Sequence, residues 1–88
     1  MNQTILNAVR NMQTLTFWYH GESRTVDPHC YGRDGKGHDA IRAYQHGKGW
    51  RLFHVHELRS LSAGSQGFRP QNDYKRNDKA MDRIYAQV

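Results

Sequence analysis

Short runs of alternating apolar and polar residues recur along the chain, and this period of two is typical of β-strands that bury one face. In residues 49–58, Phe53 and Val55 share a face with Arg51, opposite Trp50 and His54. The same alternation predicts strands over residues 15–20, 24–28 and 39–45, and a short fifth strand over 58–61. Five short strands in so small a chain predict a strongly bent sheet that closes into a barrel.

Turn-forming residues separate these strands. Gly21, Gly47 and Gly49 lie in turns over residues 20–23 and 46–49, and further glycines mark a loop over 29–38. Pro28 is expected to end the second strand, because proline has no N–H to donate to a sheet.

Apolar residues at helical spacing predict a helix at each end of the chain. The first runs to about residue 13 from a cap at Asn2 or Thr4, and the second spans residues 77–88 from a cap at Asn77 or Asp78. A connection with little periodicity, residues 63–76, precedes the second helix. We therefore expect one α+β, mainly β domain over residues 1–88, with a barrel over about 14–62. The two apolar stripes are Ile5, Leu6, Val9 and Met12, and Met81, Ile84, Tyr85 and Val88.

The composition adds positive charge to this picture. The chain has a formal net charge of +5 and a pI of about 9.7, and 11% of its residues are aromatic. This combination is typical of proteins that bind nucleic acids or nucleotides, although many solubilising surfaces are equally basic. No apolar run approaches a membrane span, and the first residues lack the features of a signal peptide. Since Cys30 is the only cysteine, we expect no intrachain disulfide and a cytoplasmic location.

At the ends of two predicted strands a cation occupies a position on the core-facing side, where burial alone would disfavour it. Arg24 and Arg51 occupy such positions, and Tyr19 ends the core face of the first strand. At the rim of a closed sheet a guanidinium can bind phosphate oxygens bidentately, and a tyrosine ring can stack on a base. The alternative is that each arginine pairs with a carboxylate, Asp27 or Glu57, and ties the barrel together.

The outer face offers further candidates. By parity Arg42 and His54 are expected to face solvent, where they would extend a positive rim or serve as ordinary exposed residues. Trp18, Tyr44 and Trp50 form an aromatic platform there or pack under the terminal helices.

Metal binding and catalysis find little support in the residue spacing. His54 and His56 share a strand face, but the paired cysteines or close Cys/His spacing of a structural zinc site are missing. The two Gly-Lys-Gly tripeptides lack the spacing of a phosphate-binding loop, and Cys30 and His29, as neighbours on a strand, point apart. We therefore expect no metal, no cofactor and no enzymatic activity.

Four separate pieces of the chain resemble, in order and spacing, the WYL domain family. They are Leu15-x-Phe17-x-Tyr19, Arg24-Thr25-Val26-Asp27-Pro28, Ile41-Arg42-Ala43-Tyr44 and Trp50-Arg51-Leu52-Phe53-His54-Val55-His56-Glu57-Leu58, the last being similar to the family pattern Trp-Arg-x-Phe-Arg-Leu-Asp-Arg-Ile. The resemblance covers about residues 5–61. Two departures stand out: the Trp-Tyr-Leu tripeptide falls on residues 39–41, where only Ile41 matches, and His54 replaces an arginine.

The resemblance implies an Sm-like or SH3-like barrel that senses a nucleic acid, such as a single-stranded oligonucleotide, or a nucleotide-like effector. Such modules belong to bacterial transcriptional regulators, often in phage defence or DNA-damage responses. This chain has no room for their usual helix-turn-helix domain, so we expect a free-standing module that serves a larger regulatory protein. The expected ligand-binding residues are Tyr19, Arg24, Arg42, Trp50, Arg51, Phe53 and His54.

A second hypothesis is a protein-interaction adaptor without a nucleic-acid ligand. In that case the chain forms a homodimer through a barrel edge and residues 64–74. Five short strands can hardly bury all the aromatic residues, which favours this hypothesis.

Overall fold

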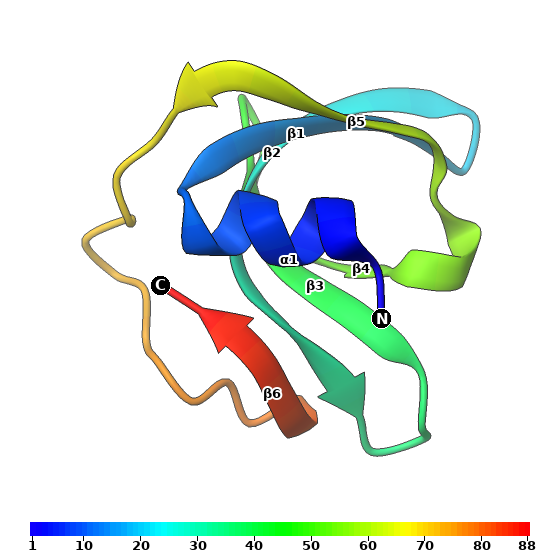
Figure 1. Ribbon diagram of the computed structural model, residues 1–88, viewed down its shortest axis with the longest axis vertical. Helices are drawn as coiled ribbons and strands as arrows, with labels where there is room; N and C mark the ends of the chain where they lie inside the picture. The colour runs from blue at the N-terminus through cyan, green and yellow to red at the C-terminus, as the bar shows by residue number, and fades with distance from the viewer.

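The computed structural model describes residues 1–88 and contains one α-helix, six antiparallel strands and a turn of 3-10 helix (Figure 1). In chain order the elements are α1 (Gln3–Arg10), β1 (Gln13–Tyr19), β2 (Glu22–Asp34), β3 (Asp39–Gln45), β4 (Gly49–His54), η1 (Val55–Glu57), β5 (Arg59–Gly67) and β6 (Met81–Gln87). The prediction of a mainly β domain is confirmed. Asn2 caps α1, since its side chain accepts a hydrogen bond of 3.0 Å from the Ile5 N–H, but the helix ends at Arg10.

The strands form one sheet that does not close, so the predicted five-stranded barrel is wrong. Their order is β4-β3-β2-β1-β5, and β6 pairs with β2 beside this path. The two ends of the order, β4 and β5, do not pair with each other. Instead the sheet curls around α1, which packs against β1, β2, β5 and β6 (Figure 1). The helix fills the curl with buried side chains, and the sheet therefore stays open around it.

β2 is the longest strand, and it runs through Pro28 into the region expected to be a loop. β3 pairs along one edge of β2, while β1 and then β6 pair along the other. Pro28 lies between Val26, the last residue paired with β1, and Cys30, the first paired with β6. The N–H that proline lacks disrupts the sheet least where β2 changes its partner from β1 to β6. A bulge between Pro28 and Cys30 accommodates the irregularity. The expectation that Pro28 ends the strand is therefore wrong.

The C-terminal segment forms β6, so the predicted helix over residues 77–88 is wrong as well. β6 pairs with Cys30–Asp34 of β2, and the Tyr85 hydroxyl donates a hydrogen bond of 2.8 Å to Asp39 Oδ1. Pairing with the open edge of β2 outweighs the local helical spacing of the apolar residues. β5 likewise continues to Gly67, so residues 68–80, and not 63–76, connect the last two strands.

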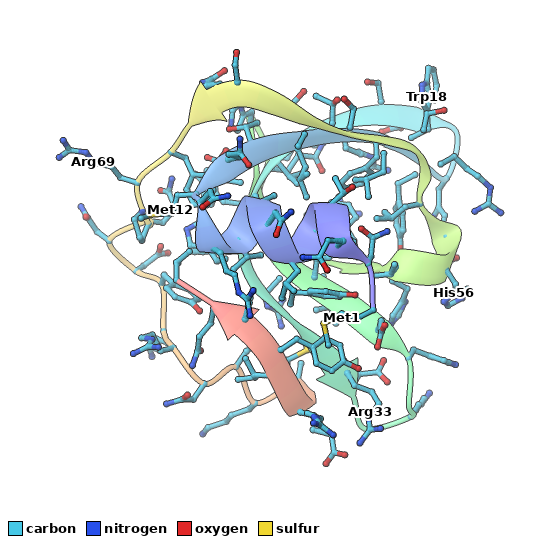
Figure 2. The ribbon with its side chains drawn as sticks, viewed as in Figure 1. Met1, Met12, Trp18, Arg33, His56 and Arg69 are labelled. Carbon is cyan, nitrogen blue, oxygen red and sulfur yellow. The ribbon has the colours of Figure 1, made fainter.

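The hydrophobic core lies between α1 and the concave face of the sheet. Phe53 is fully buried there and packs edge-to-face on Phe17 and Tyr19, with ring centroids 5.0 Å and 4.9 Å apart. Met12 and Trp18 stay outside this core, as Figure 2 shows, with exposed fractions of 39% and 49%. The sequence places Met12 in the apolar stripe of the first helix, but the helix ends before this residue.

Candidate ligand-binding site

Four of the expected ligand-binding residues come together on the concave side of the sheet. Tyr19 and Phe53 are buried in the core. Arg24 lies over the Tyr19 ring and Arg51 over the Phe53 ring, each with its guanidinium carbon 5.8 Å from the ring centroid. Of the four side chains only Arg51 is exposed. This group therefore offers a single guanidinium to solvent.

Arg24 is held by protein groups on three sides. Its Nη1 donates a hydrogen bond of 3.2 Å to Gln45 Oε1, and its Nη2 donates one of 3.2 Å to the Tyr19 carbonyl. Glu22 supplies a carboxylate oxygen 3.5 Å from Nη2, and Nε has no partner. The Arg24 side chain is only 6% exposed, so it links β2 to β1 and β3 from inside the fold.

Arg42 and Trp50 lie on the opposite, convex face of the sheet, where residues 73–79 cover them in part. Arg42 Nε donates a hydrogen bond of 2.6 Å to Asp78 Oδ2. Trp50 Nε1 lies 3.1 Å from both carboxylate oxygens of Asp73, and its ring packs on Tyr44 with centroids 5.4 Å apart. The connection folds back over this face, so Arg42, expected to face solvent, keeps only 29% of its side chain exposed.

His29 anchors the connection to the sheet. Its Nδ1 lies 2.8 Å from the Asp27 carbonyl oxygen and its Nε2 lies 3.1 Å from the Gln71 N–H. A neutral imidazole with its proton on Nδ1 satisfies both partners. Burial lowers the pKa of His29, which keeps the ring neutral. The His29 carbonyl also accepts a hydrogen bond of 3.2 Å from the Tyr74 hydroxyl.

A concavity of about 470 Å³ opens between the convex face of the sheet and the connection. Arg42 and Trp50 contribute from the sheet, and residues 73–79 form the rest of the lining. Tyr74 stands beside Trp50, with ring centroids 5.9 Å apart. The lining includes four cationic side chains and two carboxylates: Arg42, Lys75, Arg76 and Lys79, and Asp73 and Asp78. We call this site the basic concavity.

The charges of the basic concavity are unevenly paired. Arg42 forms its ion pair with Asp78, whereas Lys75, Arg76 and Lys79 form none. Burial alone would raise the pKa of Asp78, but hydrogen bonds from Arg42 and from the Ala80 N–H outweigh it and lower the pKa. Asp78 is therefore ionised at neutral pH and paired with Arg42, and three unpaired cations remain beside the single unpaired carboxylate of Asp73.

Tyr74 brings both an aromatic ring and a hydroxyl group to the basic concavity. Burial, the largest cause, raises the pKa of Tyr74 to about 12, so the hydroxyl stays protonated at neutral pH. That hydroxyl is already used in its hydrogen bond to the His29 carbonyl, which fixes the ring. A fixed ring beside Trp50 offers a surface on which a planar group can stack.

His54 lies apart from the basic concavity, at the end of β4. Its Nε2 is 3.3 Å from Asp34 Oδ2, and its Nδ1 is 3.5 Å from Glu57 Oε2. The expected ligand-binding residues therefore divide into three places: the core-facing group, the basic concavity and this histidine.

Sequence reasoning missed residues 73–79 and the anchoring role of His29. The signal for the first was present, because Tyr74 is followed at once by Lys75 and Arg76, and aromatic and basic residues side by side favour anion binding. The role of His29 had no local signal, since its partner Gln71 lies 42 residues away in the chain.

Comparisons of the chain with protein-family models, with curated protein sequences and with solved structures each gave no match. None of the helical segments has both the length and the apolar character needed to span a membrane. What the basic concavity can bind must therefore be inferred from its own residues.

Proposed function

We propose that this protein is a ligand-sensing module that binds a single-stranded nucleic acid or a nucleotide-type anion in the basic concavity. Arg42 and Trp50 contribute from the sheet, and residues 73–79 supply the remaining contacts. The observation that carries the proposal is the combination of two neighbouring aromatic rings, Trp50 and Tyr74, with three cations that have no ion-pair partner.

The chemistry of these groups suits a phosphate-bearing planar ligand. Arg76 can bind two phosphate oxygens at once with its planar guanidinium, and Lys75 and Lys79 add positive charge along a backbone. Trp50 and Tyr74 offer faces on which a base can stack, an interaction that is worth about 1–3 kcal/mol per base. Asp78 is paired with Arg42, and Asp73 accepts a hydrogen bond from the neutral Trp50 indole, so one unpaired carboxylate stands against the three unpaired cations.

The resemblance to the WYL domain family supports the same class of ligand. We propose on this ground that the module acts in bacterial transcriptional or phage-defence regulation, together with a larger regulatory protein. A lone cysteine with no partner for a disulfide suits the reducing cytoplasm, where we expect the protein to act. No enzymatic activity is part of this proposal.

Fluorescence anisotropy with a labelled single-stranded oligonucleotide tests the proposal. The double variant Arg76→Ala/Lys79→Ala removes two unpaired cations from the basic concavity. We expect it to bind about tenfold or more weakly than the parent, and to show a shallower dependence of affinity on salt, because fewer counterions are released on binding.

The matched control is Arg10→Ala/Arg83→Ala, which removes the same charge from exposed residues outside the basic concavity. We expect its affinity to stay close to that of the parent. If both double variants weaken binding equally, the attraction depends on net charge alone and the concavity is not the site. If the parent does not bind oligonucleotides, mononucleotides or cyclic nucleotides, the proposal is wrong.

A second candidate function, an adaptor that dimerises, is favoured by one observation. Trp18 is 49% exposed on β1, and the neighbouring edge strand β5 has no second partner in the sheet. A second copy of the chain could pair along that edge and cover the indole ring. Light scattering over a range of concentrations, with and without oligonucleotide, separates the two functions. A dimer that is indifferent to nucleic acid and lost in Trp18→Ser favours the adaptor.

A further inference from the structure

A second group of polar side chains lies at the far end of the hairpin formed by β2 and β3. Asp34 ends β2, His38 precedes β3, and His54 ends β4. One potential ligand atom from each of these three side chains lies within 4.8 Å of the other two. None of the three belongs to the basic concavity, so a ligand held by them is independent of the proposed function.

The backbone holds these three residues in place. The Asp34 N–H donates a hydrogen bond of 2.8 Å to the His38 carbonyl, which closes the turn. In return Asp34 Oδ1 accepts hydrogen bonds of 2.9 Å from the N–H groups of Lys36 and His38. His54 is the register partner of Ala40, two residues beyond His38, and the His38 and His54 ring centroids lie 5.9 Å apart.

The hydrogen bonds of the turn use neither Asp34 Oδ2 nor His54 Nε2. Asp34 uses Oδ1 for the turn, and its other oxygen, Oδ2, lies 3.3 Å from His54 Nε2. On the far side of the ring, His54 Nδ1 lies 3.5 Å from Glu57 Oε2. A carboxylate behind one ring nitrogen favours the proton there and leaves the other nitrogen free as a ligand, which is the usual arrangement around metal-binding histidines.

Glu57 is itself fixed for this role. Its carboxylate accepts a hydrogen bond of 3.1 Å from the Tyr19 hydroxyl and lies 2.8 Å from His20 Nε2. These two contacts hold the Glu57 carboxylate in place behind the His54 ring.

A third imidazole and the local charge add to the group. The His56 ring centroid lies 5.2 Å from that of His38 and 5.9 Å from that of His54. Figure 2 shows His56 at the outside of the fold, next to the turn that follows β4. All these residues line an open concavity of about 570 Å³, in which Asp34 and Glu57 provide two carboxylates against the single ammonium of Lys36.

We propose that Asp34, His38 and His54 form a binding site for one divalent transition-metal ion, with His56 in reach of a further position. Two or three imidazoles and one carboxylate are a ligand set that suits Zn²⁺, Ni²⁺ or Cu²⁺ and not Mg²⁺ or Ca²⁺, which prefer oxygen ligands alone. Three protein ligands with an open position are compatible with zinc. Residue spacing alone does not indicate this site, because the ligands come from three segments of the chain.

Titration calorimetry with ZnCl₂ on the full chain tests the site, and Co²⁺ provides a second readout. We expect one Zn²⁺ per chain. We also expect Co²⁺ to broaden selectively the backbone amide NMR signals of residues 34–38 and 54–56. The variants His38→Ala and His54→Ala should each weaken binding by about tenfold or more, and Glu57→Gln, which removes the carboxylate behind His54, by about tenfold.

The matched control is His46→Gln, which removes one imidazole at the opposite end of β3. We expect it to bind Zn²⁺ like the parent. Far-ultraviolet circular dichroism of each variant, recorded without metal, establishes that the fold is retained. An absence of saturable binding, Co²⁺ broadening centred on other residues, or an equal loss of affinity in His46→Gln would each overturn the proposal.

Discussion

Arg42 Nε and Asp78 Oδ2 lie 2.6 Å apart, although 36 residues separate them in the chain. This ion pair holds residues 73–79, which form most of the lining of the basic concavity, against the middle of β3. Because Arg42 is already paired with Asp78, the unpaired positive charge in the basic concavity comes from Lys75, Arg76 and Lys79. Arg42 therefore holds the site together through its ion pair, and the three unpaired cations supply most of the charge that a ligand would meet.

Asp78→Asn should lower the free energy of unfolding by about 1–3 kcal/mol, because it leaves the partly covered guanidinium of Arg42 without its counter-charge. Urea denaturation followed by circular dichroism measures the change. Asp82→Asn is the matched control, since Asp82 forms only a long, exposed pair of 3.7 Å with Arg33 and should contribute little. Equal midpoints for the two variants would contradict a stabilising role for the Arg42 pair.

Stability should fall when the pH drops below the ordinary His pKa of 6.5, owing to His29. Burial lowers the pKa of His29 in the folded protein, so between the lowered value and 6.5 the unfolded chain binds the extra proton. The stabilisation is therefore fully present above 6.5 and is lost as the pH falls toward the folded pKa. Urea midpoints across this range measure it, and an imidazole NMR titration of His29 with a pKa at or above 6.5 would contradict it.

Cys30 should not react with thiol reagents while the protein is folded. The side chain is fully buried, and burial raises its pKa to about 11, so almost no thiolate exists at neutral pH. Ellman's reagent at neutral pH should release colour slowly from the native protein and rapidly in concentrated urea. Rapid modification of the native protein would show that β2 opens easily at this position.

Gly32→Ala should displace β6 from the edge of β2. A Cβ atom at this position would clash with the Arg83 carbonyl oxygen, a backbone atom that cannot rotate away. We expect a loss of about 1–3 kcal/mol in the free energy of unfolding, together with faster hydrogen exchange in β6. Gly35→Ala, with no atom within 4 Å of the added Cβ, is the control and should be close to neutral. A neutral Gly32→Ala would contradict the close packing of β6 on β2.

The alternation of apolar and polar residues was enough to predict the strands in which it is regular. The strand expected over residues 39–45 is β3, and Phe53 is buried on the predicted face of β4. Helical spacing at the N-terminus and the cap at Asn2 also identified α1. In these segments the local preference and the tertiary environment favour the same structure.

The remaining elements depend on partners far away in the chain. β6 has apolar residues spaced as in a helix, and only the free edge of β2 makes it a strand. Local rules predict that Pro28 ends a strand. β2 nevertheless continues through it, because the partner of β2 changes there from β1 to β6. For the same reason the sequence contains the signals of Arg42, Trp50 and the basic run after Tyr74 separately, but it does not indicate that these residues meet in one concavity.

The most direct test of ligand binding in the basic concavity is an amide and indole NMR titration of the protein with a single-stranded oligonucleotide. We predict that the largest shifts fall on the Trp50 indole N–H, which now contacts Asp73, and on the amides of residues 73–79. The Trp18 indole, on the exposed side of β1, serves as the internal reference and should not move. Shifts centred on Trp18 or on Arg51, or no shifts at all, would contradict the assignment of the basic concavity as the binding site.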